Sequence, residues 1–148
     1  MIKTILAILF STSILFAQDV KVGSYLPFEY CKNQFDQSII VDKKTKMLII
    51  SFNQEQDQIV NEFLEKHKKF LKKHKAYYLR DVSTIPTFVL SMFIKPKLKS
   101  YDYEIGLVCD EKQALQIPKK EGKITIIYIR KKKIRRILFK DNLNFLAK

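Results

Sequence analysis

The stretch KMLIISFNQEQDQIVNEFLEK (46–66) passes from an apolar run into an amphipathic one, and this change decides the fold. The run from Lys46 to Phe52 is apolar between charged flanks, which is typical of a strand covered on both faces. From Gln54 to Lys75 the apolar residues recur close to a period of 3.6, which predicts a long helix. The apolar residues of this helix are Ile59, Val60, Phe63, Leu64, Phe70 and Leu71.

The segments on either side have the patterns of further strands and helices. Before this unit, residues 24–42 alternate apolar and polar side chains around Lys32-Asn33, which predicts a short hairpin. After it, Pro86 marks the start of a second helix, over about 85–94, that ends before Pro96. We also expect strands at 76–83, 101–110, 123–130 and 132–140, a loop at 111–122, and a C-terminal helix at 141–148 capped by Asp141 or Asn142.

The order of these elements predicts an α/β fold. A strand, a helical crossover and a second strand imply a parallel pair, and the closing hairpin must add antiparallel strands. The result is a mixed sheet flanked by helices, with an N-terminal β-hairpin. The chain of 148 residues has no Gly/Ser/Pro-rich linker and no internal repeat, so we expect one domain over 18–148.

The first residues are typical of a secretory signal peptide. Lys3 precedes an apolar run of 12 residues, Ile5 to Phe16, and a helix of that length spans about 18 Å, short of the ~30 Å of bilayer hydrocarbon. Ala17 then offers a cleavage site for a signal peptide over 1–17, although Leu15 departs from the usual small residue. We expect export, most simply to a periplasm, with an uncleaved anchor as the alternative.

The charge of the chain favours anionic partners. The formal net charge is +13, and +12 without Lys3. Such basicity favours binding to a membrane surface or an acidic protein, and export makes nucleic acid the least expected partner.

The densest run of charge, RKKKIRR (130–136), is the candidate patch for an anionic partner. An alternative interpretation is a solvated sheet edge whose cations discourage aggregation between strands. The patch consists of Arg130, Lys131, Lys132, Lys133, Arg135 and Arg136.

The order of elements over residues 22–148 resembles the thioredoxin-like fold. VGSYLPFEY (22–30) is also similar to the opening strand of peroxiredoxin-type relatives. The resemblance implies that an attacking cysteine would lie at the turn between the first core strand and the first long helix. Here that turn falls within Asn53 to Ile59, where amides and acids stand and no residue is a cysteine.

The resemblance also implies a proline before the third core strand. The matching place is KEGKI (120–124), and Pro118 stands several residues early. Ile85-Pro86-Thr87 looks superficially like the same proline motif, and it is read here as a helix start because a helical pattern follows it. The alternative, in which Ile85-Pro86-Thr87 is the proline motif of the resemblance and not a helix start, stays open.

No other constellation predicts a catalytic, cofactor or metal site. Cys31 and Cys109 match no metal or redox spacing; export permits a disulfide, and two buried thiols are the alternative. His67 and His74 share a helix face without a third ligand in sequence. Carboxylates near the helix start have a simple dipole role, and these are Glu55, Asp57 and Glu62.

The sequence therefore predicts an exported, redox-inactive thioredoxin-like protein that serves as a binding or structural module, with no cofactor. One alternative is a periplasmic thiol oxidoreductase that uses Cys31 or Cys109 outside the usual position. Another is a peripheral binder of anionic membrane. Because the chain lacks a thiol at the strand–helix turn, we expect the turn to keep the geometry of a redox site without its reagent.

Overall fold

The computed structural model of the chain describes residues 20–26 and 30–148. The expected signal peptide, 1–17, lies outside these ranges. In the part that is described, no helix is both long enough and apolar enough to span a bilayer.

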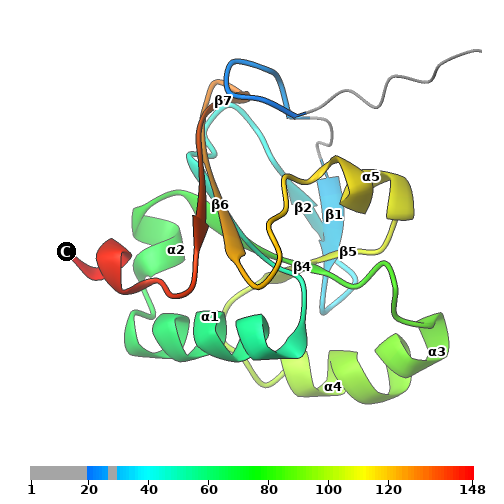
Figure 1. The fold of residues 1–148 in the computed structure, drawn as a ribbon. Coiled ribbons are helices and arrows are strands. Elements are labelled where there is room, and N and C mark those ends of the chain that lie inside the picture. The colour runs from blue at the N-terminus through cyan, green and yellow to red at the C-terminus, as the bar shows by residue number, and fades with distance from the viewer. Residues whose placement is uncertain (1–19, 27–29) are drawn as a thin grey trace, which may run out of the picture.

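The described strands form one mixed sheet of seven strands in the order β2-β1-β5-β4-β3-β6-β7. The central strands β3, β4 and β5 are parallel, and the pairs on either side of them are antiparallel (Figure 1). The strands are β1 (Tyr30–Asn33), β2 (Ser38–Ile40), β3 (Met47–Ser51), β4 (Ala76–Asp81), β5 (Ile105–Val108), β6 (Ile124–Arg130) and β7 (Lys133–Lys140).

The apolar run from Lys46 to Phe52 contains β3, an inner strand of this sheet. Every residue of β3 is buried, because β4 and β6 flank it and side chains cover both of its faces. Met47 and Ile49 belong to the core on one face, and Leu48 and Ile50 belong to the core on the other. The prediction of a strand buried on both faces is confirmed.

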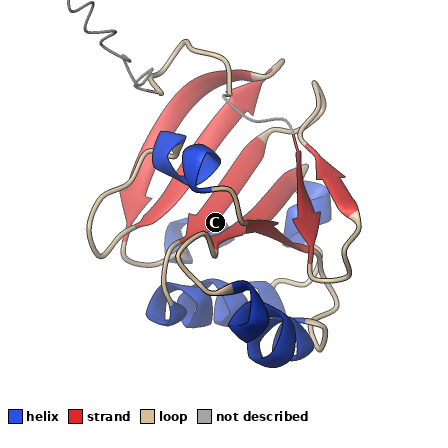
Figure 2. Cartoon of the chain, turned by 90° about the vertical axis from the view of Figure 1, so that its right-hand side faces the viewer, coloured by secondary structure: helices blue, strands red, loops and turns tan. Residues whose placement is uncertain are grey.

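Helices cover both faces of the sheet (Figures 1 and 2). Val60 and Leu64 of α1 (Gln54–Lys66) pack into the first core, and Ile117, just after α5 (Glu111–Gln116), packs into the second. The expected mixed sheet with flanking helices and an N-terminal hairpin is therefore confirmed. The hairpin turns at 34–37 rather than at Lys32-Asn33, since both of those residues belong to β1.

The long helix begins where the sequence predicts it and ends earlier. Asn53 caps α1, and its side-chain oxygen accepts a hydrogen bond from the Gln56 N–H at 2.9 Å. The expected continuous helix to Lys75 is wrong, because α1 stops at Lys66 and a short α2 (Phe70–Lys73) follows. A helix of that full length would span about 33 Å, twice the ~17 Å of the strand it must run back along.

The second crossover also differs from its prediction. Pro86 precedes α3 (Thr87–Val89), which confirms the helix start, but the helix does not end before Pro96. It continues through a π-helical segment, η1 (Leu90–Ile94), into α4 (Lys95–Leu98). In η1 the wider turn lets the Lys95 N–H bond to the Leu90 carbonyl, and Pro96, which has no N–H, then stands in the first turn of α4.

Two further expectations are corrected. The expected loop at 111–122 contains α5, whose cap is Asp110, with its carboxylate accepting from the Lys112 N–H at 2.8 Å. The expected strand at 101–110 is shorter, since only β5 within it pairs in the sheet. At the C-terminus a 3-10 helix, η2 (Asn144–Ala147), replaces the expected α-helix. Its N-cap is Leu143 and not Asp141 or Asn142, although the Asn142 side chain accepts a hydrogen bond from the Asn144 N–H at 3.1 Å.

Candidate functional site

Four polar side chains meet in the interior where β3 gives way to α1. Ser51 ends β3 and Asp57 lies on α1, while Tyr78 and Arg80 come from β4. The Ser51 hydroxyl donates to Asp57 Oδ1 at 2.5 Å, and the Tyr78 hydroxyl lies 3.0 Å from the same oxygen. Arg80 Nε contacts Asp57 Oδ2 at 2.6 Å. This junction cluster therefore joins the first helix to two central strands.

The cluster is nearly closed to solvent. The side chains of Arg80 and Asp57 are 11% and 8% exposed, and Ser51 is wholly buried. Burial raises the pKa of Asp57, whereas the Ser51 hydrogen bond and the Arg80 cation oppose that rise. Burial, followed by the charge of Asp57, raises the pKa of Tyr78 well above its usual value, so Tyr78 stays a neutral donor. A hydroxyl that no substrate can reach is not a nucleophile, so neither Ser51 nor Tyr78 is a candidate for catalysis.

The place of Asp57 in the first turn of the helix predicts a dipole role, whereas the structure shows that it also forms an ion pair with Arg80. The sequence does contain a sign of this ion pair, because Asp57 lies on the same face of the helix as Val60, Asn61 and Leu64, all of which are buried. A carboxylate on a buried stripe requires a partner, and Arg80 directly follows the buried Leu79 in β4. The other two expected acids, Glu55 and Glu62, are exposed on the helix surface.

Both cysteines are free thiols, and neither lies at the strand–helix turn. Cys31 is buried in β1, and burial is the main cause that raises its pKa to about 12. Cys109 follows β5 and is exposed, which corrects the expectation of two buried thiols. Partial burial nevertheless raises the Cys109 pKa, against the opposing charge of Lys95. A raised pKa lowers the fraction of thiolate, the form that attacks disulfides.

The basic run forms the hairpin between β6 and β7. Lys131 and Lys132 make the turn with φ angles of 50° and 66°, in the left-handed region. Within β7, Ile134 pairs with Ile129 and Arg136 pairs with Tyr128, so Arg135 is the extra residue of a bulge. The bulge explains why Arg135 and Arg136 are both exposed, as are Arg130 and Lys131.

Not every residue of this basic hairpin (130–136) is available on the surface. Lys132 and Lys133 are partly buried, and the Lys133 ammonium lies 5.1 Å from the centre of the Tyr25 ring. Residues 23–26 bond to the start of β7, for example through Gly23 N–H to the Ile134 carbonyl at 2.7 Å. The rest of β7 is the last strand of the sheet. The hairpin therefore combines a charged tip with a charged sheet edge.

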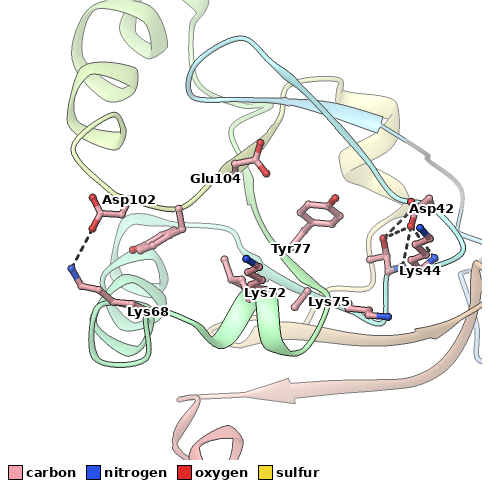
Figure 3. Close-up of a pocket in the computed structure, with 12 residues that line it drawn as sticks. Asp42, Lys44, Lys68, Lys72, Lys75, Tyr77, Asp102 and Glu104 are labelled. Carbon is pink, nitrogen blue, oxygen red and sulfur yellow. Dashed lines mark hydrogen bonds and ion pairs between the residues drawn. The ribbon is translucent and has the colours of Figure 1, made fainter.

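A cavity of about 510 Å³ lies at the other end of β4, around Tyr77 (Figure 3). Both lysines and acids line it. Lys68 pairs with Asp102 at 3.2 Å, and Asp42 accepts hydrogen bonds from the backbone N–H groups of Lys44 and Thr45 at 2.8 and 3.1 Å. Four lysines and three acids line the cavity, so one positive charge is in excess, and the Lys68–Asp102 pair holds one charge of each sign.

The two histidines contact aromatic rings. The ring centres of Phe63 and His67 are 4.6 Å apart, and those of Phe70 and His74 are 4.2 Å apart. Among the residues described, no three His, Cys, Asp or Glu side chains come together as a candidate metal site.

Comparison with known proteins identifies the fold. No protein-family model matches the sequence, and no curated protein matches it significantly. Solved structures do match. A candidate protein disulfide isomerase from Bacteroides thetaiotaomicron shares 16% identity over 86% of this chain and 84% of its own, with a TM-score of 0.55.

Two further matches are similar in extent. The thioredoxin domain of a thiol-disulfide oxidoreductase from Bacteroides vulgatus shares 15% identity over 86% of this chain and 95% of its own, with a TM-score of 0.52. A peroxiredoxin-like protein from Aquifex aeolicus shares 12% identity over 84% and 78%, with a TM-score of 0.53. The chain therefore has a thioredoxin-like fold, as the resemblance in its sequence implies.

Proposed function

We propose that the chain is an exported thioredoxin-fold protein without thiol–disulfide activity, which acts as a binding or structural module. One observation carries the proposal: the strand–helix turn holds Asp57, paired with Arg80, and no thiol. Thiol exchange needs a thiolate that a helix N-terminus or a neighbouring cation activates. In this chain the first turns of α1 carry amides and carboxylates, Gln54 to Gln58, while Cys31 lies in β1 and Cys109 follows β5.

The positions of the cysteines support the same proposal. Cys31 is shielded by the core, and its pKa of about 12 leaves very little thiolate at neutral pH. Cys109 is accessible, and its pKa is raised as well. An off-position oxidoreductase would have to use Cys109, because Cys31 is inaccessible to a folded substrate.

The test of redox inactivity is the reduction of insulin disulfides by dithiothreitol, with a thioredoxin as positive control. We expect the chain to give the uncatalysed rate, and the same rate from the variant with Cys31→Ser and Cys109→Ser. Catalysis that disappears with Cys109→Ser alone would establish the off-position enzyme. Catalysis that survives both substitutions would reveal chemistry outside the thiols.

Export rests on residues 1–17, whose short apolar run and small residue at Ala17 are typical of a signal peptide. A C-terminally tagged chain should be released by osmotic shock, with an intact mass that lacks the first 17 or so residues. Release together with cytoplasmic markers, at full mass, would contradict export.

A second candidate function is peripheral binding to an anionic surface through the basic hairpin. The observation that favours it is the pair of lysines at the tip, Lys131 and Lys132, held at φ angles that non-glycine residues rarely adopt. Strained residues of this kind concentrate at functional sites.

A further inference from the structure

A cavity of about 390 Å³ opens beside the junction cluster, between α1 and the helical segment formed by η1 and α4. Residues from α1, β4, η1, α4 and the loop after α4 line it. They are Gln54, Asp57, Gln58, Asn61, Arg80, Phe93, Ile94, Lys97, Leu98 and Tyr101. A cavity of this size lies at the lower end of the range for ligand pockets, which suits a small molecule.

Arg80 is the polar side chain that a ligand in this cavity would contact. Its side chain is 11% exposed, and its Nε contacts Asp57 at 2.6 Å. Within the described residues, the structure gives its terminal nitrogens no hydrogen-bond partner, and they are not among the fully enclosed unpaired atoms. A guanidinium has five N–H donors, so donors remain for an acceptor that enters the cavity.

The balance of charge in the cavity is positive. Asp57 is the one acidic residue that lines it in the described part of the chain, and its charge is already paired with Arg80. Lys97 then adds a further cation from α4. Asn61 uses its side-chain oxygen to accept from the Tyr103 hydroxyl at 2.6 Å, which leaves its amide N–H₂ as a donor. The polar side of the cavity therefore presents donors to a ligand.

The opposite side of the cavity is apolar. Phe93, Ile94, Leu98 and Tyr101 form it, and Phe93 is 58% exposed. A large apolar side chain that stays exposed beside a concave polar site is typical of a binding surface. Phosphate or sulfate would satisfy the donors but leave these side chains in contact with water.

We propose that this cavity binds a small carboxylate that carries an apolar group. The carboxylate accepts hydrogen bonds from the free N–H groups of Arg80 and from Lys97, and the apolar group packs on Phe93 and Tyr101. The ligand would be a short fatty acid or the apolar carboxyl-terminal residue of a peptide, since both have this chemistry. This inference rests on the proposed function, because it gives the binding module a class of ligand.

The test is a titration of the full chain with hexanoate and, separately, with N-acetylphenylalanine. Binding is measured by the changes in chemical shift of the backbone N–H groups in NMR spectra. We expect saturable binding of at least one, with shifts in α1, η1 and α4. The arm that binds more tightly identifies the source. The amides of both probes should bind at least roughly tenfold more weakly, as loss of a charge-assisted hydrogen bond predicts. Inorganic phosphate should also bind more weakly, because it has no apolar group to pack on Phe93 and Tyr101.

Variants separate this site from the general basicity of the chain. Lys97→Gln and Phe93→Ala should each weaken binding several-fold, and Lys99→Gln, which removes an exposed lysine just beyond α4, should not change it. The proposal is overturned if neither carboxylate binds saturably, if the amides bind equally well, or if Lys99→Gln has the same effect as Lys97→Gln. Failure here would leave the insulin assay untouched, so it is distinguishable from failure of the proposed function.

Discussion

Asp57 and Arg80 form a buried ion pair that fixes the first helix to the central strands. Such a pair is not in itself strong evidence for added stability, because removing two charges from water is costly. Loss of one partner is different, since the other charge then stays buried without compensation. The Ser51 and Tyr78 hydroxyls add hydrogen bonds to the same carboxylate, so the effect of each residue depends on the others.

We predict that Asp57→Ala lowers the free energy of unfolding by about 3–5 kcal/mol, because Arg80 is left as an unpaired buried cation. Urea denaturation of the purified variant measures this loss. The matched control is Glu55→Ala, an exposed acid in the first turn of the same helix, for which we expect a loss of ~1 kcal/mol or less. Similar losses in both variants would mean that Asp57 acts only through the helix dipole.

The elements were predictable where local pattern and tertiary packing agree. Residues 47–51 are apolar throughout and form a central strand, and Asn53 with the periodic residues after it defines the start of α1. Features that depend on distant parts of the chain were not predictable from the local pattern. Helix α1 ends at Lys66 because the chain must return to the start of β3, where Lys46 N–H bonds the Lys75 carbonyl at 2.9 Å.

Other elements were missed because their local signals are weak or misleading. Pro96 normally ends a helix, but a π-helical turn before it accommodates the missing N–H. Helix α5 has Asp110 as its cap and few apolar residues, so its period was not evident. The candidate cavity was also not predictable, since it needs Arg80 and Lys97 to meet across two elements.

We predict that Leu64→Ala in α1 destabilises the chain by about 2–5 kcal/mol, because the truncated side chain leaves a cavity in the core. Leu64 is 1% exposed and belongs to the core that α1 shares with β3 and β4. Thermal or urea denaturation measures the change. Glu62→Ala, at an exposed position of the same helix, is the control and should stay within ~0.5 kcal/mol. An unchanged stability for Leu64→Ala would mean that this helix face is not docked on the sheet.

Substitutions in the turn between β6 and β7 should increase the stability of the chain. Both turn residues have positive φ, the conformation of a two-residue turn that Asn-Gly adopts most readily. Replacing Lys131→Asn and Lys132→Gly together should raise the stability by roughly 1 kcal/mol, read as a higher Tm. The control is Lys131→Gln with Lys132→Gln, which removes the same charges and keeps the strain. An equal gain in the control would assign the effect to charge repulsion instead.

The whole molecule is strongly basic, and the basic hairpin is one of the places in the described part of the chain where exposed cations gather. Another is the end of α1 together with α2, where six lysines occur within residues 66–75. Exposed charges of this kind act over a screening length of ~8–10 Å near physiological ionic strength. Binding that depends on either cluster should therefore weaken steeply with salt.

We predict that Lys131→Glu with Arg135→Glu and Arg136→Glu weakens co-sedimentation with anionic lipid vesicles. The comparison variant reverses three exposed lysines at the other cluster, with Lys69→Glu, Lys72→Glu and Lys73→Glu. Each variant changes the net charge by the same amount, so a greater loss in the hairpin variant would assign binding to that surface. Equal losses would mean that net charge alone drives association, and no loss in either would leave the hairpin as a protected sheet edge.

The central claim concerns the molecule as a whole: a thioredoxin-like fold without a reactive thiol. Its most direct test is the reaction rate of the native chain with an aromatic disulfide reagent across pH 6–10, compared with the urea-unfolded chain. Because folding raises the pKa of both thiols, to about 12 for Cys31, each carries less thiolate in the folded state at any pH in this range. We expect Cys31 to be protected and Cys109 to react more slowly than in the unfolded chain, with a rate that still rises at the top of the range. A native thiol that reacts faster than its unfolded counterpart at neutral pH, with a rate that levels off below pH 7, would contradict the account.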